Sequence, residues 1–221
     1  TASTAGYGIR VSLSSSNVVS RNRIAKNAEY GVCINGSSDN KFFYNNFIQN
    51  TIQAYISESH DNLWDDGYPS GGNYWSNYSD TDFYSGPGQN ITGSDGIGDT
   101  PHVIDASNRD NYPLMNLWTN IVVMNILRSK PAVGQGYSLS INVTVKNQGY
   151  TTLTFNVTTY ANTILLGMKQ ITISSGFSST VSFDWNTTGF AKGNYTLSAV
   201  ADTVSGERDT SDNTYPDSWV F

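Results

Sequence analysis

The apolar and polar positions of residues 8–53 form a pattern that repeats along the chain. A shift of 23 places, which brings Gly8 onto Gly31, superposes the two copies. A fixed period in this range predicts a solenoid, in which each unit buries its apolar side only by stacking on the next. A weaker third copy follows if Ala54 lies under Gly31 and Tyr55 under Val32, with one residue deleted before Asn62. The matched pairs are Gly8/Gly31, Ile9/Val32, Val11/Ile34, Asn17/Asn40, Val19/Phe42, Asn22/Asn45, Ile24/Phe47 and Asn27/Asn50.

Each copy holds three short runs in which apolar and polar residues alternate, and Ser, Asn and Gly separate these runs. No run is long enough for a helix, so the pattern predicts three short strands per turn. The chain is therefore expected to begin as the last coils of a right-handed parallel β-helix. Side chains alternate between the two faces of a strand. The residues expected inside are Ile9, Val11, Ile24, Val32, Ile34, Phe42, Phe47 and Tyr55.

The repeated asparagines are expected to be structural. Stacked coils place them about 4.8 Å apart, where amides can hydrogen-bond along the stack and tolerate the left-handed backbone of a tight corner. Cys33 is expected to face solvent between Val32 and Ile34, as a bystander rather than a nucleophile.

Residues 62–78 are dense in Asp, Gly and aromatic residues, and they follow the last copy of the repeat. The end of a solenoid exposes apolar surface and unpaired strand edges, which must be covered. We therefore expect this segment to form a cap. The alternative is an aromatic platform that binds sugars. The aromatic residues concerned are Trp64, Tyr68, Tyr74, Trp75 and Tyr78.

The stretch that follows alternates carboxylates with glycines. This arrangement suits Ca²⁺, because several oxygens must converge while Gly lets the backbone turn and present carbonyls. Asp95, Asp99 and the carbonyl of Ile97 are the predicted ligands. Asp80, Asp82 and Asp110 are candidates to complete the shell. The alternative is an Asp-Gly turn without metal.

Three motifs in this order carry a resemblance to a known family: residues 67–78, residues 95–101 and residues 110–115. Residues 1–116 resemble the β-helix domains of the nitrous-oxide-reductase maturation, or periplasmic copper-binding, type. Such domains recur in archaeal surface proteins. The family name alone suggests copper, but soft copper sites need Cys, Met or His in convergent positions. The chain has one Cys, three Met and two His, and His60 lies far from His102 in sequence.

After Met115 the pattern changes to longer alternating strands. Seven of them, separated by turns, predict an immunoglobulin-like sandwich, and the division into domains is expected as 1–117 and 118–221. The strand ranges are 121–127, 137–146, 153–160, 165–173, 178–185, 193–202 and 215–221.

Motifs of the second part resemble the cell-adhesion-related (CARDB) domain of bacterial and archaeal surface proteins. They lie at residues 133–136, 143–149, 183–187, 193–199 and 207–213. The resemblance implies a spacer or adhesive module without catalysis. Trp185 is expected to anchor the core. Glu207, Asp209 and Asp212 are expected in a solvated turn, with a second cation site there as the alternative.

Composition bears on compartment and partners. A net charge of −6 argues against nucleic acid, which needs basic grooves. One Cys allows no internal disulfide, and no span of about 18 apolar residues predicts a membrane helix. We expect a fragment of a longer secreted protein on the cell surface. Seven glycosylation sequons occur, at Asn35, Asn77, Asn90, Asn142, Asn156, Asn186 and Asn194.

The combined expectation is a non-catalytic extracellular surface protein, structural or adhesive, glycosylated and stabilised by Ca²⁺. Its expected partners are other copies, other envelope proteins or surface glycans. The alternative is a β-helix protein that binds or degrades polysaccharide, such as a lyase or hydrolase. Fold analogy alone supports that reading. The only dense cluster of candidate groups is His60 and Asp61 with Asp65 and Asp66, and it lies where the cap is expected, so no catalytic residue is predicted.

Overall fold

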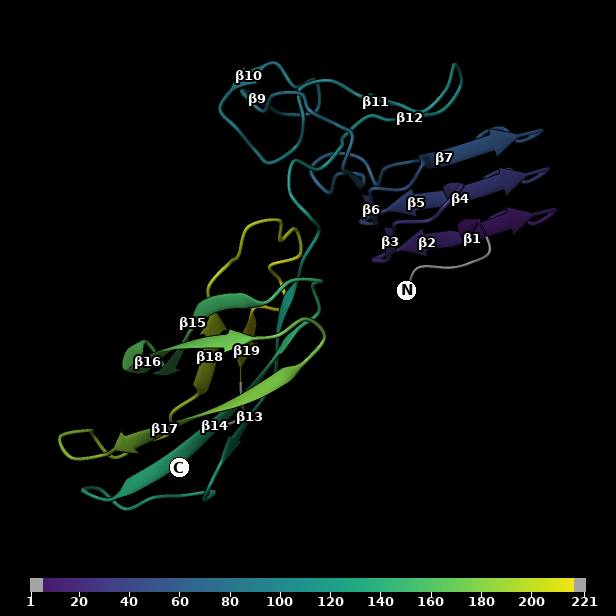
Figure 1. Ribbon diagram of the computed structural model, residues 1–221. Coiled ribbons are helices and arrows are strands. Elements are labelled where there is room, and N and C mark those ends of the chain that lie inside the picture. Colours follow the sequence, from purple (N-terminus) through teal and green to yellow (C-terminus); the bar gives the residue numbers. More distant parts are fainter. Residues whose placement is uncertain (1–5, 217–221) are drawn as a thin grey trace. The chain divides into compact units, whose positions relative to one another are not determined.

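The computed structural model describes residues 6–216, and these residues are all-β, with no helix among them. They form two compact units that divide between Trp118 and Thr119. Figure 1 shows the short stacked strands of the first unit and the longer strands of the second.

Three short parallel sheets make up the start of the first unit. The first sheet contains β1 (Tyr7–Ser12), β4 (Tyr30–Asn35) and β7 (Ile52–Ser57), in that order. The second pairs β2 (Val18–Ser20) with β5 (Lys41–Phe43), and the third contains β3 (Arg23–Ala25), β6 (Asn46–Ile48) and β8 (Tyr74–Trp75). Figure 1 shows β1, β4 and β7 lying one above another.

The register follows the sequence repeat. Ile9 pairs with Val32, Val19 with Phe42 and Ile24 with Phe47, as the shift of 23 places predicts. Between the strands the chain turns at residues in the left-handed region, and these turns also repeat. Because residues other than Gly, Asn and Asp rarely adopt this conformation, the stacked repeats must hold it in place. The repeated positions are Leu13/Gly36/Glu58, Ser16/Asp39/Asp61, Arg21/Tyr44 and Lys26/Gln49.

Stacked carboxamides fill the corners, and the prediction that the repeated asparagines are structural is confirmed. The Nδ2 of Asn17 donates to the Oδ1 of Asn40 at 2.8 Å, and the Nδ2 of Asn40 donates to the Oδ1 of Asn62 at 3.0 Å. The same acceptor oxygens also receive backbone N–H groups, as Asn40 Oδ1 does from Asn17 N at 3.0 Å. The ladders are Asn17–Asn40–Asn62, Asn22–Asn45–Asn73 and Asn27–Asn50.

The interior of the repeats agrees with the prediction except at one position. Tyr55 was expected under Val32, but Ala54 pairs with Val32 and Tyr55 pairs with Cys33. Tyr55 is 43% exposed, so the inward column of Ile9, Val32 and Tyr55 is wrong. Asn27 still bonds to Asn50 across 23 places, whereas Tyr30 pairs with Ile52 across 22. The deleted residue therefore lies in the corner before β7, ahead of the place predicted for it.

Cys33 is also a correction, because its side chain is buried rather than solvent-facing. It lies on the outer side of β4, where its strand neighbours are Arg10 and Tyr55. Burial raises the pKa of the Cys33 thiol, and Arg10 opposes this. The thiol is therefore a poor nucleophile, as predicted, although for a different reason.

Two tryptophans stack on aromatic residues of the second repeat. Trp64 stacks on Phe42 with ring centroids 4.6 Å apart, and Trp75 stacks on Phe47 at 4.2 Å. Both indoles are 1% exposed. Their burial leaves neither indole face open to a sugar. The cap also contains two small hairpins, β9 (Tyr84–Ser85) with β10 (Ile91–Thr92) and β11 (His102–Val103) with β12 (Arg109–Asp110).

The second unit has two antiparallel sheets, and its strands agree with the seven predicted. The sheet order β13-β14-β17 joins Ile121–Arg128, Ser138–Asn147 and Ser178–Asn186. The other sheet has the order β16-β15-β18-β19 and joins Ile164–Ile173, Leu153–Ala161, Leu197–Ala201 and Thr214–Pro216. The last strand was predicted over 215–221, of which residues 217–221 lie outside the described residues.

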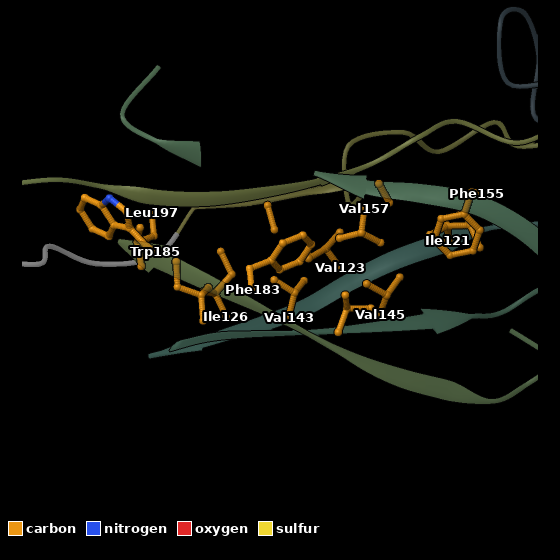
Figure 2. Packing of buried hydrophobic residues seen from close by; sticks show 14 of the residues in the cluster. Ile121, Val123, Ile126, Val143, Val145, Phe155, Val157, Phe183, Trp185 and Leu197 are labelled. Carbon is orange, nitrogen blue, oxygen red and sulfur yellow. The ribbon is translucent and has the colours of Figure 1, made fainter. Parts of the chain in front are cut away.

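The core of the second unit consists of alternate residues of these strands. Val143 and Val157 are fully buried, and Phe183 is 4% exposed. Figure 2 shows Trp185 at one end of this core, 3% exposed, so the predicted anchor is confirmed. Trp185 makes edge contacts with Phe190 and Tyr195, with ring centroids 5.1 and 5.3 Å apart.

The ladders generate the first testable prediction. Asn45 is fully buried; it accepts from Asn22 and donates to Val19 O at 2.8 Å and to Asn73 Oδ1 at 3.0 Å. Asn45→Ala leaves these buried groups without partners, so we expect the free energy of unfolding to fall by about 3 kcal/mol. Urea denaturation followed by tryptophan fluorescence measures this loss. Asn90→Ala, at an exposed position, is the control; an equal loss in both variants would contradict the role of the ladder.

Candidate functional site

The acid-rich loop of the cap contains the residues predicted to bind Ca²⁺. Asp82 accepts hydrogen bonds from the backbone N–H groups of Asp95 at 3.0 Å and Gly96 at 2.7 Å. In return, Asp99 accepts from the N–H groups of Phe83 and Tyr84, both at 3.0 Å. The two carboxylates thus tie the segment 80–84 to the segment 95–100.

Asp80 and Asp95 make further bonds in the same loop. Asp80 accepts from the hydroxyl of Thr100 and from the N–H of Thr81, and these bonds lower its pKa, that from Thr100 most. Asp95 accepts from Ile97 N at 3.0 Å and from Gln89 Nε2 at 3.3 Å. All four acids therefore serve as acceptors for groups of the loop itself.

Ile97 is fully buried and forms a bridge with Leu114. The bridge is held by hydrogen bonds from Gly98 N to Pro113 O at 2.9 Å and from Met115 N to Gly96 O at 3.1 Å. The Ile97 side chain thus anchors the loop to the end of the cap, a role that the motif Asp-Gly-Ile-Gly-Asp did not reveal.

Asp110 lies fully buried among other residues. Its oxygens accept from Asn73 N at 2.7 Å, Trp75 Nε1 at 2.8 Å and Tyr112 N at 3.1 Å. Burial raises the pKa of Asp110 to about 7, although these N–H groups act in the opposite direction. Gly72 is required beside it, because a Cβ there would lie 1.9 Å from Asp110 Oδ1. Asp110 therefore joins the asparagine ladder to the tryptophan of the cap.

The positions of these side chains decide which metal ions they could bind. Within residues 6–216, no group of three or more His, Cys, Asp or Glu side chains is arranged to hold a metal ion. Copper does not fit, because Cys33 is buried in the sheet, His60 is exposed and His102 stacks on Trp75. Calcium at the acid-rich loop stays a prediction, and the same acids already have a role without metal.

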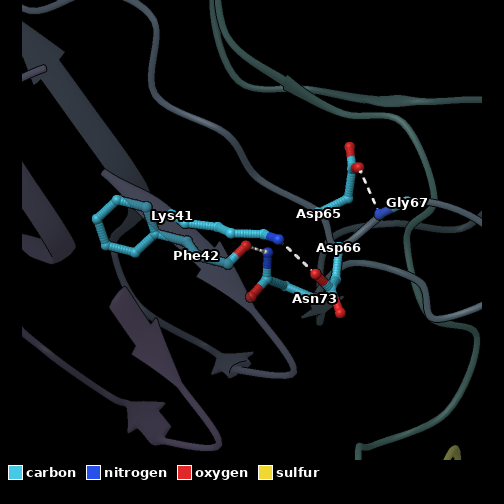
Figure 3. A network of polar contacts seen from close by, with 6 residues as sticks. All are labelled: Lys41, Phe42, Asp65, Asp66, Gly67 and Asn73. Carbon is cyan, nitrogen blue, oxygen red and sulfur yellow. Dashed lines mark hydrogen bonds and ion pairs between the residues drawn. The ribbon is translucent and has the colours of Figure 1, made fainter. Parts of the chain in front are cut away.

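The acids near His60 also have structural partners. Asp65 accepts from Gly67 N at 3.0 Å and from Asn111 N at 3.0 Å, and Asp66 forms an ion pair with Lys41. Figure 3 shows Asp65 and Asp66 turned to different partners, with Asn73 bonded to the carbonyl of Phe42. A glycosidase needs two carboxylates across a cleft. These acids do not form such a pair.

The sequons differ in how accessible their asparagines are. The amide of Asn35 donates to Ser57 Oγ at 2.7 Å, and the sequon hydroxyl of Ser37 is fully buried. Asn156 donates to Asp202 at 2.8 Å, and Asn142 accepts from Ser182 at 2.7 Å in the middle of a strand. The acceptors with exposed side chains are Asn77, Asn90, Asn186 and Asn194.

In the second unit, Glu207 is a correction, because it was expected in a solvated turn and is 9% exposed. It accepts from Ile121 N at 2.7 Å, Val204 N at 3.0 Å and Asn213 Nδ2 at 3.0 Å. Burial raises its pKa, and the hydrogen bonds oppose this. Glu207 thus fastens the loop before β19 to the start of β13, which explains its place in the motif 207–213.

Comparison with known proteins confirms the resemblance of both halves. Residues 1–80 match the family model of the periplasmic copper-binding protein (NosD), and residues 120–215 match the CARDB model. No curated protein matches the chain. Among residues 6–216, no helix has the length and apolar character of a membrane span.

Solved structures that resemble the chain include CARDB domains. The CARDB domain of the PF1109 protein from Pyrococcus furiosus, in complex with di-metal ions, is 23% identical at a TM-score of 0.40 and covers 45% of this chain and 89% of that one. The 272–376 domain of a candidate cell surface protein from Methanosarcina acetivorans is 24% identical at a TM-score of 0.38. The match covers 45% of this chain and 88% of that one. The β-glucosidase EmGH1 from Erythrobacter marinus is 15% identical at a TM-score of 0.37. The match covers 54% of this chain and 18% of the β-glucosidase.

The cap generates a prediction on pH. Burial against Trp75 and Tyr78 lowers the pKa of His102 below its ordinary value of 6.5. The unfolded chain therefore binds more protons than the folded one near and below pH 6.5, so stability is lost as the pH falls through this range. Asp110, whose pKa is raised, has the opposite sign, so only a comparison of variants isolates His102.

We expect His102→Phe, which keeps the ring stack, to lose less stability than the wild type between pH 7 and 5.5. Thermal unfolding at several pH values measures this difference. The exposed His60, changed to Gln, is the control and should behave as the wild type does. Parallel pH profiles for His102→Phe and the wild type would show that the imidazole does not titrate differently on folding.

Proposed function

We propose that the protein is a non-catalytic extracellular surface protein with a structural or adhesive role. Residues 1–117 are the last coils and the cap of a right-handed parallel β-helix. Residues 118–221 are an immunoglobulin-like, cell-adhesion-related domain. Its partners are other copies, other envelope proteins or surface glycans.

The observation that carries this proposal is the use made of the carboxylates. A general base or nucleophile must leave an oxygen within reach of a substrate. In the cap, Asp82, Asp99 and Asp110 instead direct oxygens at backbone N–H groups. Three cavities of about 290 to 380 Å³ lie on the described residues. None of these three is lined by a pair of carboxylates.

The repeat supports the β-helix. Each of the three parallel sheets contains one pair of strands 23 residues apart, and the asparagine ladders lie at the corners between these strands. The return of the chain to the same three sheets in the second repeat supports stacked coils. The two family descriptions, one of a periplasmic protein and one of a cell-adhesion-related domain, support a location outside the cytoplasm.

The proposal predicts that the protein lies on the cell surface and does not cleave polysaccharide. Protease added to intact cells should remove the protein, and purified protein should release no reducing ends from envelope polysaccharide. The control is a cytoplasmic protein of the same cells, which must survive the protease. Release of reducing ends that Asp65→Asn and Asp66→Asn abolish would favour the enzyme instead.

Calcium is the remaining part of the proposal. The support is that Asp80, Asp82, Asp95 and Asp99 lie on two segments that are bonded to each other. Acids this close repel one another, and an ion that collects them lowers the cost of ordering the loop. The proposal predicts that excess chelator lowers the melting temperature and that added Ca²⁺ restores it.

The variant Asp95→Ala with Asp99→Ala distinguishes the two roles of these acids. Loss of their hydrogen bonds should destabilise the protein by about 1–3 kcal/mol whether or not metal binds. Under the calcium proposal, the double variant also loses its response to chelator. A wild-type melting curve that chelator leaves unchanged means that N–H donors alone hold the loop.

A further inference from the structure

A cavity of about 300 Å³ lies in the first unit, between the start of β7 and the cap. The residues that matter here are Thr51, Ile52 and Gln53 from one side and Asn77, His102 and Val103 from the other. Its volume is at the lower end of the range for small-molecule sites, which suits one sugar ring rather than an oligosaccharide.

The wall on the β7 side is the edge of a sheet. β7 pairs with β4, and no further strand joins it among the described residues. An edge strand presents backbone N–H and C=O groups that water or a ligand must satisfy, and it invites pairing with another chain. The cavity therefore borders a part of the molecule that benefits from a cover.

The lining is polar but uncharged. It contains no Asp, Glu, Lys or Arg within the described residues, so it offers nothing that would select an ion. Gln53 and Asn50 are already bonded, Gln53 Nε2 to Ser76 Oγ at 2.9 Å and Asn50 Nδ2 to Gln53 Oε1 at 2.7 Å. At the rim, Ile52 is 46% exposed and Val103 is 67% exposed. Apolar rims beside neutral polar groups match a sugar, which has C–H faces and hydroxyl groups.

One lining residue is also a sequon asparagine. Asn77 is exposed, and Ser79, which completes the sequon Asn77-Tyr78-Ser79, is exposed as well. Asn156 makes an instructive contrast, because it also lines a cavity but its amide nitrogen donates to Asp202. Asn77 therefore combines access, a sequon and an adjacent cavity.

We propose that Asn77 carries an N-linked glycan whose first sugar, a neutral pyranose, lies in this cavity and covers the edge of β7. This deepens the proposed function and rests on it. The donor is an oligosaccharide on a lipid phosphate. Asn77 Nδ2 forms a bond to the anomeric carbon and loses one proton to the transferase. The bond from the anomeric carbon to the phosphate oxygen breaks, and the lipid phosphate leaves with the electron pair.

Attachment explains why a shallow site suffices. A sugar linked to Asn77 is held beside the cavity, so its effective concentration there is high and little intrinsic affinity is needed. The sugar then replaces water at the β7 edge and screens Ile52 and Val103. In these terms the glycan is part of the cap.

The test compares two sequons in the native, glycosylated protein. Ser79→Ala removes the Asn77 sequon without changing Asn77, and Thr92→Ala removes the sequon of the exposed Asn90, which is the matched control. Intact-mass and glycopeptide analysis measures occupancy. Thermal unfolding and amide hydrogen exchange of residues 52–54 measure the effect.

We expect Asn77 to be occupied, and Ser79→Ala to lower the melting temperature and speed exchange at residues 52–54 about tenfold. Thr92→Ala should lose its glycan without either change. In protein made without glycosylation, Ser79→Ala should have no effect. If Asn77 carries a glycan but its removal by Ser79→Ala changes neither the melting temperature nor the exchange rates, the inference is overturned and the proposed function is not.

Two other outcomes are distinct. Native protein without any glycan overturns both the inference and the glycosylation expected from the sequons, but not the proposed surface location, which the protease assay tests separately. Protection of residues 52–54 in unglycosylated protein by added free oligosaccharide identifies a free saccharide as the occupant. That result overturns the attachment to Asn77.

Discussion

Backbone N–H groups at turns need acceptors that the strands do not supply, and side-chain oxygens supply them throughout this protein. In the stacked repeats the acceptors are carboxamides, as when Asn40 receives both the N–H and the amide of Asn17. In the cap they are carboxylates, as in Asp99 and Asp110. In the second unit Glu207 does the same for Ile121. Buried N–H groups without partners are costly, so each turn depends on its side chain.

The repeat and the strands could be predicted from the sequence because both are periodic. A period of 23 fixes which residues stack, and alternation fixes which side chains are buried, as at Val32 and Phe47. The prediction for Tyr55 was wrong because a single deletion moves the residues that follow it to the opposite face. The deletion lies in a corner, where no apolar pattern marks it. The period of a repeat can therefore be predicted more reliably than the strand register next to an insertion or deletion.

The roles of the acids could not be predicted in the same way. Asp110 and Glu207 are buried, although their polarity indicates exposure, because several N–H groups from distant parts of the chain meet at each. The sequence shows that Asp and Gly alternate, but this pattern fits both a metal loop and a loop braced by N–H donors. The partners of each oxygen do not show in this pattern: Asp82 and Asp99 bind N–H groups 13 to 16 positions away, and Asp110 binds that of Asn73 across 37.

The equivalence of neighbouring repeats has a consequence for how such a protein changes length. The first repeat pairs with the second through three parallel strands and the same corner amides, so a whole repeat can be gained or lost without disturbing these contacts. Every such event moves the two ends of the stack apart or together by one strand spacing, about 4.8 Å. The reach of the molecule is thus adjustable in fixed increments by duplication within a gene, while the tryptophan end piece remains the same.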